Sequence, residues 1–359
     1  MGKTYWGAAA IAAAAVLAAT PAMAQTQTGV LAPNAAQAVP AAKPWYKQPW
    51  NASRVRPCDR ECLVEIADSY LRALETKDYS RLPFAEEVAF TENTAHLDIG
   101  EGTLWRADIK PTNFIIHVAD PVTGQIGVQI VYEVEGKPAL VAIRLKVERR
   151  MITEVEQLID RNVAPQAMEL LQTPRPTLLN DVPAKQRSSR EYLLYAANSY
   201  FDALTGEDGH IAPFADECVR HEQGYQTVNN KKPGRASPSP QLPDTSTEMG
   251  RTFSRLSTMT CEQQISTKIF TGIKKIWPRR AIIDEQKGLV AIFPLFVHDG
   301  TKRKTGGPGD NDKRLGMVLN MVTMETFGIR QDKIWEVEAF PFIIVPYGMG
   351  DGWTNARAR

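Results

Sequence analysis

The sequence has almost no excess charge of either sign. Its 359 residues include 42 Lys and Arg against 41 Asp and Glu, which gives a formal net charge of +1 at pH 7. Proteins that bind nucleic acid by broad electrostatic attraction need a strongly basic surface, so this balance argues against that class. Hydrophobic residues make up 43% of the chain, which is enough for a packed core and excludes disorder of the whole chain.

The motifs of cofactor and metal chemistry are also missing. The sequence contains no Walker loop, no dinucleotide-binding glycine fingerprint and no GxSxG nucleophile motif. No group of His, Asp, Glu or Cys has the spacing of a metal site. We therefore expect a protein that works without a bound cofactor or metal.

Residues 1–24 have the pattern of a secretory signal peptide. Ala8–Ala19 is an unbroken apolar stretch, and Ala22-Met23-Ala24 places small residues at the positions that signal peptidase reads. The alternative is a membrane anchor, but this run is shorter than the ~20 residues that span a bilayer, and no later run reaches that length. We predict an exported protein, periplasmic or secreted, with a flexible Ala-, Pro- and Gln-rich leader over residues 25–57.

Export bears on the interpretation of the four cysteines. In an oxidising compartment an even number of cysteines favours disulfides over metal ligands. Cys58 and Cys62 are four residues apart near a predicted helix start, so the preferred pairs are Cys58–Cys62 and Cys218–Cys261. The other two ways of pairing four cysteines stay open.

An internal repeat is the strongest signal in the chain. Ser69–Glu87 (SYLRALETKDYSRLPFAEE) and Ser199–Glu217 (SYFDALTGEDGHIAPFADE) agree at nine of 19 positions. Further on, ITEVE at Ile152–Glu156 matches IWEVE at Ile334–Glu338. The repeat predicts two copies of one unit, with these boundaries: domain 1 over 58–160, a Pro-rich linker over 161–188, and domain 2 over 189–359 with loop insertions at 229–250 and 301–314.

Each half begins with a helical pattern and ends with long strands. Ile126–Val134 alternates apolar and polar residues, which is typical of a half-buried strand. Leu289–Val297 and Met317–Met324 are apolar on both faces, which indicates a sheet that is covered on both sides. The predicted fold class is α+β, with two tandem cone-shaped α+β barrels, each a strongly curved antiparallel sheet around helices, packed on each other as a pseudo-dimer.

Four motifs of the first half carry a resemblance to a known family: TEN, GEGTLW, ADPVTG and RLKV followed by ITEVE, at 91–93, 100–105, 119–124, 144–147 and 152–156. With these motifs the chain resembles the SnoaL-like domains of the nuclear-transport-factor-2-like superfamily, and within it a secreted subfamily of poorly known function. The second half shares the resemblance only through the repeat, because TEN and GEGTLW are altered there.

The resemblance implies an apolar cavity inside each cone and acid–base chemistry without a cofactor. Relatives in the superfamily include ketosteroid isomerase, scytalone dehydratase, polyketide cyclases and lyases that remove formaldehyde from lignin-derived diaryl compounds. Many other members only bind or scaffold, so the fold alone does not determine the activity.

Polar residues that interrupt the apolar face of a strand are the candidate catalytic groups, because burial fits a carboxyl group for proton transfer near neutral pH. Glu92 and Glu222 occupy equivalent positions of the repeat, and Glu325 interrupts a further apolar strand. His221 is a candidate base, although neighbouring residues on a strand face opposite ways. The alternative for each of Glu92 and Glu222 is a structural hydrogen bond at a strand end.

Other side chains are assigned more simply. Glu154, Glu156, Glu336 and Glu338 alternate with apolar residues, which predicts a solvated face. The tail Phe340–Trp353 is rich in Gly and Pro and is predicted to fold back as a lid. Seven aromatic residues are candidates for binding a flat ligand, with core packing as the alternative for each: Trp105, Tyr132, Tyr225, Trp277, Phe293, Trp335 and Tyr347.

The leading hypothesis is an exported, cofactor-independent lyase or isomerase that moves a proton on a hydrophobic, aromatic small molecule such as a lignin-derived diaryl compound. The alternative is a non-catalytic protein of the cell envelope that binds small molecules or has a structural role. Neither hypothesis involves nucleic acid or a membrane span after signal cleavage, and assembly into a homo-oligomer stays open.

Overall fold

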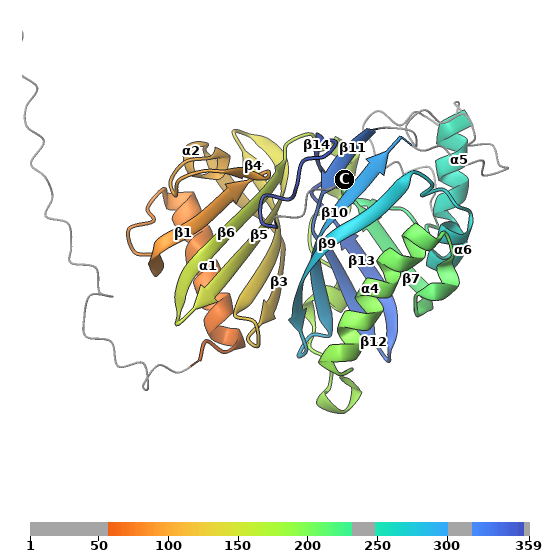
Figure 1. Ribbon diagram of the computed structural model, residues 1–359, viewed down its shortest axis with the longest axis horizontal. Helices are drawn as coiled ribbons and strands as arrows, with labels where there is room; N and C mark the ends of the chain where they lie inside the picture. The colour runs from red at the N-terminus through yellow and green to blue at the C-terminus, as the bar shows by residue number, and fades with distance from the viewer. Residues whose placement is uncertain (1–56, 232–247, 301–317, 355–359) are drawn as a thin grey trace, which may run out of the picture. The chain divides into compact units, whose positions relative to one another are not determined.

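Two β-sheets and a few helices make up the described part of the protein (Figure 1). The structure is a computed structural model that describes residues 57–231, 248–300 and 318–354, all within one compact unit, Val55–Arg359. No helix within these ranges is long and apolar enough to cross a membrane.

Several sequence predictions fall on other residues. The predicted signal peptide (1–24), nearly all of the leader (25–57), the insertion at 301–314 and most of the insertion at 229–250 lie outside the described residues. These assignments stay predictions.

The first half consists of one long helix and a six-stranded sheet. The helix starts after Asp59, whose side chain accepts a hydrogen bond from the N–H group of Cys62, and it ends at Lys77 in the left-handed conformation. Across the sheet the strands follow the order β2-β1-β6-β5-β4-β3, with β1 and β6 parallel. The elements are α1 (Arg60–Thr76), β1 (Phe84–Glu92), β2 (Ala95–His96), α2 (Thr103–Arg106), β3 (Ile109–Asp120), β4 (Gln125–Val134), β5 (Lys137–Glu148) and β6 (Met151–Asp160).

A connecting segment with η3 (Pro165–Glu169), α3 (Pro176–Leu179) and η4 (Ala184–Gln186) leads to the second half. That half repeats the order of a helix, a short strand pair and long strands. Its elements are α4 (Arg190–Gly206), η5 (Gly209–Ile211), β7 (Phe214–Glu222), β8 (Tyr225–Gln226), α5 (Glu248–Ser257), α6 (Cys261–Ser266), β9 (Ile273–Asp284), β10 (Leu289–Asp299), β11 (Val318–Val322), β12 (Glu325–Arg330), β13 (Lys333–Ala339) and β14 (Ile343–Pro346).

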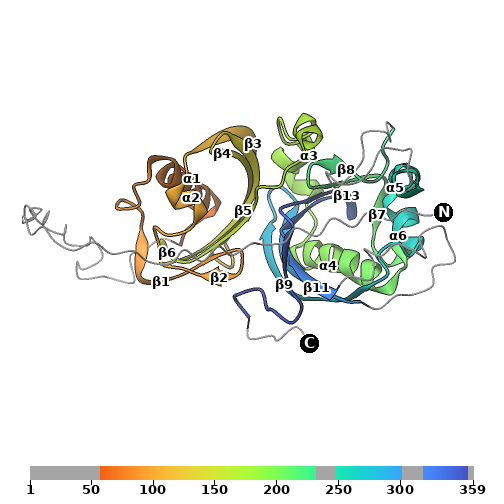
Figure 2. The same cartoon turned by 90° about the horizontal axis from the view of Figure 1, so that it is seen from above.

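The strand order of the second sheet follows that of the first. It runs β14-β11-β10-β12-β13-β7-β8, so that, read from its last strand, β8, β7 and β13 correspond to β2, β1 and β6. Strand β9 pairs with the other side of β10, and β7 and β13 are parallel. Strands β11 and β12 pair with successive parts of β10, so together they occupy the place that β5 has in the first sheet. Figure 2 shows each sheet curved around its own helix, α1 or α4.

Apolar side chains cover both faces of each sheet. One core lies around α1 and a second around α4. A third joins the other faces of the two sheets, where Phe114 and Leu140 of the first half belong to the same buried cluster as Phe293 and Met324 of the second. Strand β10 contributes Ile292 to one core and Phe293 to another, which explains its apolar pattern on both faces.

Two ion pairs join the halves in a reciprocal way. Arg60, the first residue of α1, lies 3.0 Å from Asp284 at the end of β9. Arg190, the first residue of α4, donates to both oxygens of Asp120 at the end of β3, at 2.9 and 2.6 Å. Each Asp also accepts from the backbone N–H group of the residue before the other Asp, at 3.3 and 3.1 Å. Each half thus supplies one arginine and one aspartate to these contacts.

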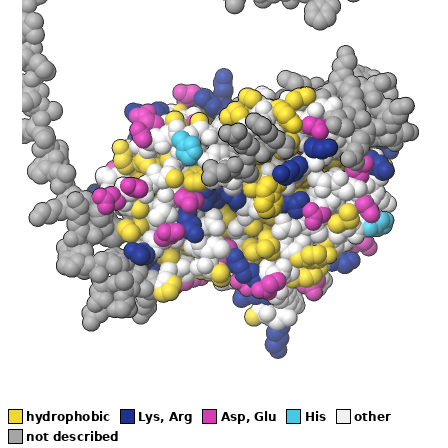
Figure 3. All heavy atoms as spheres, in the orientation of Figure 1, with side chains coloured by type: hydrophobic (Ala, Val, Ile, Leu, Met, Phe, Trp, Pro, Cys, Tyr) yellow, Lys and Arg dark blue, Asp and Glu magenta, His cyan; other side chains and the backbone are white. Residues whose placement is uncertain are grey.

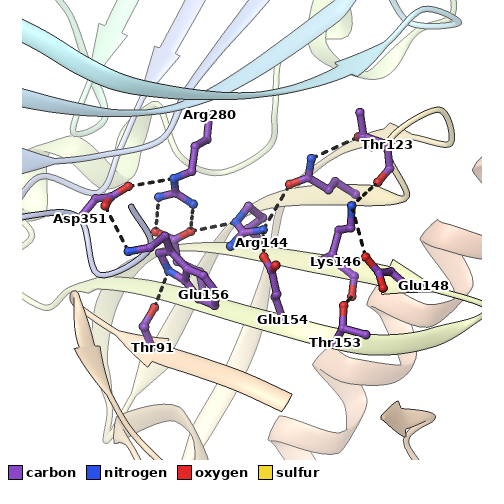
Figure 4. A network of polar contacts seen from close by, with 12 residues as sticks. Thr91, Thr123, Arg144, Lys146, Glu148, Thr153, Glu154, Glu156, Arg280 and Asp351 are labelled. Atoms are coloured by element: carbon purple, nitrogen blue, oxygen red, sulfur yellow. Dashed lines mark hydrogen bonds and ion pairs between the residues drawn. The ribbon is translucent and has the colours of Figure 1, made fainter. Parts of the chain in front are cut away.

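A second polar network also crosses between the halves (Figure 4). Arg280 on β9 donates to both oxygens of Glu156 on β6, at 2.5 and 2.8 Å, and to Asp351 at 3.0 Å. Arg144 on β5 donates to the same Glu156 at 2.9 Å. The prediction of a solvated face is therefore wrong for Glu156, and likewise for Glu336 and Glu338, which are buried and pair with Arg175.

The C-terminal tail folds back onto the first half. The ring of Trp353 lies 4.5 Å from the guanidinium carbon of Arg144, and its N–H group donates to the hydroxyl of Thr91 at 2.9 Å. This arrangement makes the tail a connection between the halves. The predicted role as a lid is not what its contacts show, because the same tail also forms β14, which pairs with β11 of the second sheet, and Asp351 pairs with Arg280 on β9.

The structure contains the two predicted disulfides, Cys58–Cys62 and Cys218–Cys261. On the face of the molecule shown in Figure 3, basic and acidic side chains are interspersed, and neither sign forms a broad region. This distribution agrees with the near-zero net charge of the sequence.

The reciprocal ion pairs lead to a prediction about stability. Asp120→Ala leaves the backbone N–H group of Ile283 without its acceptor and leaves Arg190 with only the more distant Glu285, at 3.8 Å. We therefore expect the free energy of unfolding to fall by about 3 kcal/mol in urea titrations near pH 7. Hydrogen bonds from Arg190, Thr123 and Ile283 outweigh the effect of burial and hold the pKa of Asp120 below its ordinary 3.8. The contribution of this carboxylate is thus present above that pH and is lost as the pH falls through the folded-state pKa.

The exposed pair Arg161–Glu135 supplies the control. Glu135→Ala should cost less than about 1 kcal/mol, because water screens that pair. Equal losses for the two variants would contradict a special role for Asp120 in joining the halves.

Candidate functional site

A buried arginine lies inside the second half. The side chain of Arg220 on β7 forms an ion pair with Glu222 at 2.8 Å, and its Nε donates to the hydroxyl of Thr227 at 3.1 Å. One terminal nitrogen donates to the side-chain oxygen of Gln264, and the guanidinium carbon lies 5.0 Å from the centre of the Phe270 ring. The other terminal nitrogen, Nη1, is buried and has no hydrogen-bond partner among the residues that the structure describes.

A small cavity borders this arginine. Its volume is about 40 Å³, which is room for roughly three water molecules. Polar and apolar side chains share the wall, and Glu222 is the one carboxylate in it. The lining residues are Arg220, Glu222, Thr227, Phe253, Leu256, Ser257, Gln264, Ile269 and Phe270.

A second carboxyl group lies in the same cluster. Burial and the neighbouring Glu222 raise the pKa of Glu325 to about 8, although Arg220 and a hydrogen bond from Tyr200 act in the opposite direction. Burial, Glu325 and Glu222 likewise raise the pKa of Tyr200 well above its ordinary value. Near neutral pH the cluster therefore combines a protonated acid, a neutral phenol and an ion pair. Two carboxyl groups with separated roles are typical of acid–base sites.

The same framework in the first half carries a different interior. Tyr70 on α1 is the repeat equivalent of Tyr200 on α4, and its hydroxyl accepts a hydrogen bond from Gln157 at 2.8 Å. The position of Arg220, however, is taken by Phe90, which is fully buried. The centre of the first half is therefore neutral where that of the second half is charged.

The polar residue beside the helix tyrosine comes from a different strand in each half. It is Gln157 beside Tyr70 in the first half and Glu325 beside Tyr200 in the second. In the first sheet Ile143 on β5 pairs with Gln157 on β6, and in the second Glu325 on β12 pairs with Ala339 on β13. The polar residue thus occupies one strand of the pair in the first half and the other strand in the second. Both arrangements place it beside the helix tyrosine.

Glu92 has a structural role at its strand end. Its carboxylate accepts hydrogen bonds from the backbone N–H group and the hydroxyl of Thr103, at 2.7 and 2.6 Å. Thr103 is the first residue of α2, so Glu92 satisfies an N–H group that the helix itself leaves free. Of the two equivalent glutamates, only Glu222 borders the cavity.

His221 lies apart from the cluster. It pairs in register with Glu338 on β13, and Arg175 donates to that carboxylate. Burial and Arg175 lower the pKa of His221 well below its ordinary value, so its ring is neutral. Since Glu222 and Arg220 face the interior of the second half, the structure does not bring His221 to them.

None of the seven predicted aromatic residues lines the cavity. Trp105 and Tyr132 belong to the first-half core, and Tyr225 and Phe293 belong to the cluster that joins the sheets. Trp277 and Tyr347 are 51% and 43% exposed, whereas Trp335 is half-buried and donates to the carbonyl oxygen of Arg330 at 2.9 Å.

The aromatic residues that line the cavity are Phe253 and Phe270. These two residues and Arg220 were not among the residues predicted from the sequence. A signal for Arg220 was present: Cys218, Arg220 and Glu222 alternate along one strand and therefore share a face. No comparable signal marks Phe253 on α5 or Phe270 in the turn after α6, because segments that follow the predicted insertion bring them to the site.

One match to a known protein family falls in the same half. A family model described as a domain of unknown function (DUF8021) matches residues 186–341, a range that contains Tyr200, Arg220, Glu222 and Glu325. No curated protein matches the sequence.

Three solved structures are similar to parts of the chain. An NTF2-like protein of unknown function from Cytophaga hutchinsonii shares 15% identity over 27% of this chain and 89% of its own, with a TM-score of 0.22. PrhC from Penicillium brasilianum shares 15% identity over 28% and 82%, with a TM-score of 0.24. A candidate ketosteroid isomerase from Kribbella flavida shares 14% identity over 36% and 95%, with a TM-score of 0.24.

The state of Glu325 can be tested through pH-dependent stability. The folded protein keeps this proton up to about pH 8, whereas the unfolded chain loses it near the ordinary value of 4.5. The free energy of unfolding should therefore fall as the pH rises between these values, by an amount on the order of several kcal/mol. Glu325→Gln should remove this part of the decline, as measured by urea titrations across the range.

The exposed Glu217 on the same sheet is a matched control. Glu217→Gln should leave the pH profile of the wild type unchanged. A wild-type profile that Glu325→Gln does not flatten would show that Glu325 is ionised in the folded protein.

Proposed function

We propose that the protein is a cofactor-independent isomerase or lyase that transfers a proton on a small molecule bound inside its second half. The observation that carries this proposal is the pair of carboxyl groups around Arg220. Glu222 borders a cavity and is held by a guanidinium group, while Glu325 lies deeper and keeps its proton near neutral pH.

These groups divide the chemistry between them. Glu222 acts as the base that removes a proton from a carbon atom of the substrate, because its carboxylate faces the cavity. Arg220 stabilises the negative charge that develops on a substrate oxygen, and its low-dielectric surroundings strengthen that effect. Glu325 and Tyr200 act as the neutral acids of the cluster.

The size of the cavity bears on the substrate. A cavity of about 150 Å³ holds a benzene molecule, and the cavity beside Arg220 has about 40 Å³. This volume supports a small polar group at the reacting end more than the aromatic ring expected from the resemblance. A diaryl substrate would require Phe253 or Phe270 to move.

We also propose that the two halves are SnoaL-like domains of the nuclear-transport-factor-2-like superfamily, arranged as a pseudo-dimer. The internal repeat, the shared strand order and the reciprocal ion pairs Arg60–Asp284 and Arg190–Asp120 support this proposal. In this arrangement the first half, which has a neutral interior, packs against the second half and has no catalytic role. The signal-like residues 1–24 and the two disulfides support an exported location.

A non-catalytic binding role is the second candidate. The observation that favours it is the saturation of the site: Glu222, Thr227 and Gln264 already engage two nitrogens of Arg220. A protein that only binds would hold its ligand at the remaining nitrogen without moving a proton.

Proton transfer can be measured before the substrate is identified. The wild type is incubated in D₂O with a panel of ketones, aldehydes, esters and a lignin-derived diaryl compound, and exchange at carbon is followed by proton NMR. We expect Glu222→Gln to slow the exchange of an accepted compound by about a hundredfold or more, because the base is lost.

The repeat itself provides the control for this experiment. Glu92→Gln changes the equivalent carboxylate of the first half and should leave the exchange rate unchanged. If the wild type exchanges no compound faster than Glu222→Gln does, the catalytic proposal fails and the binding role takes its place.

A further inference from the structure

We infer that an open groove on the first sheet binds an extended, arginine-containing peptide segment of a partner protein. The groove has a volume of about 470 Å³ and lies where β1, β5 and β6 meet. Its lining residues are Glu87, Val88, Ala89, Glu148, Thr153 and Glu154. The inference follows from the charge of this groove and from what the corresponding place in the second half binds, and it is independent of the proposed function.

The groove continues the polar network that joins the halves. Figure 4 shows Glu154, Thr153 and Glu148 on the far side of Arg144 from the C-terminal tail. The carboxylate of Glu154 lies 2.7 Å from Arg144, and its side chain is 37% exposed. The side chain of Glu148 is 61% exposed and lies 3.8 Å from Lys146. Both carboxylates are therefore accessible to a partner, although each has a cation beside it.

Negative charge exceeds positive charge in and beside the groove. Three of its six lining residues are glutamates. The groove and the ion pairs next to it contain five carboxylates against three cations, a net charge of −2: Glu87, Glu148, Glu154, Glu156 and Asp351 against Arg144, Lys146 and Arg280. Complementary charge is what selects a partner at an exposed surface, so a basic segment fits this groove.

The second half shows what the corresponding place binds. Glu154 and Glu336 have the same position in ITEVE and IWEVE. Their partners in the strand register are Ala89 on β1 and Val219 on β7, which are also equivalent in the repeat. In the second half the connecting segment crosses the sheet at this point, and its Arg175 forms an ion pair with Glu336. The equivalent glutamate therefore already binds an arginine of a peptide segment within the same molecule.

The conformation of that bound segment defines the kind of peptide. Arg175 has extended backbone angles, with φ of −71° and ψ of 149°. Pro176 follows it, and a proline favours this conformation in the residue before it. A partner segment with an Arg-Pro pair would have the same conformation before it binds, which lowers the entropy cost of binding.

A second contact indicates a second basic residue. Arg330 ends β12 and donates to the carbonyl oxygens of Thr177 and Asn180 in the connecting segment, at 2.7 and 3.2 Å. The residue that ends the corresponding strand β5 is Glu148. A carboxylate has no proton to donate to a carbonyl oxygen, so a cationic side chain of the peptide fits there instead. The segment thus needs one arginine in the place of Arg175 and a basic residue two to five positions further on.

The connecting segment supplies the probe. A fluorescein-labelled peptide with the sequence of residues 172–182 (QTPRPTLLNDV) and the change Asn180→Arg meets both requirements. Its binding to the full-length protein is measured by fluorescence anisotropy near pH 7 at low salt. We expect saturable binding that weakens with added salt and is about tenfold weaker for the same peptide with Arg175→Glu. No binding at protein concentrations up to about 1 mM would overturn the inference.

Matched charge variants of the protein locate the bound peptide. Glu87→Gln and Glu154→Gln should each weaken binding by about three- to tenfold. Glu133→Gln changes an exposed glutamate of β4 outside the groove and should leave binding unchanged. Weakening by Glu336→Gln but not by Glu154→Gln would show that the probe only replaces the connecting segment, which contradicts a site on the first sheet.

A shortened chain distinguishes a partner from the protein's own C-terminal residues. Residues 355–359 (NARAR) follow the tail and contain two arginines. Equal binding of the probe to the full chain and to a variant that ends at Thr354 supports a partner segment. Binding that appears only in the shortened variant would assign the groove to residues 355–359 and overturn the inference.

Discussion

The paired contacts of Arg60 with Asp284 and of Arg190 with Asp120 hold the structure together at its centre. Each arginine starts the helix that fills one half, and each aspartate ends a long strand of the other half. Because the carboxylates are buried, neither partner can be lost without leaving a charge or an N–H group unsatisfied. The position of α4, and with it Tyr200 beside Glu325, therefore depends on contacts with the first half.

The interiors of the two halves differ in charge. A tyrosine on the central helix meets a polar side chain from the sheet in both halves, Gln157 in one and Glu325 in the other. Where the first half has Phe90, the second half has Arg220, and a buried arginine requires a counter-charge and hydrogen-bond acceptors. The second half supplies them through Glu222, Thr227 and Gln264, and the last comes from a helix, α6, tied to β7 by the Cys218–Cys261 disulfide. The added charge, helix and disulfide thus form one arrangement.

Much of the fold was predictable because local patterns agree with it. The helix starting near Arg60 and both disulfides appear as expected. Glu222 and Glu325 were found as polar interruptions of apolar strands, and the structure brings them to one arginine. Glu156 and Glu338 were assigned to a solvated face, because the arginines that cover them, Arg280 and Arg175, are 124 and 163 residues away in the chain. An alternating pattern cannot distinguish water from a distant partner of opposite charge.

The sequence by itself determined the long helices and strands and which side chains share a strand face, since these properties depend on neighbours a few residues apart. Only the tertiary structure decided which of the two equivalent glutamates borders a cavity. Glu92 is used by the N-terminus of α2, whereas Glu222 faces Arg220 under the wall formed by α5 and α6. The physical reason is that a buried charge takes its role from the groups that surround it in space, and those groups come from segments far apart in the chain.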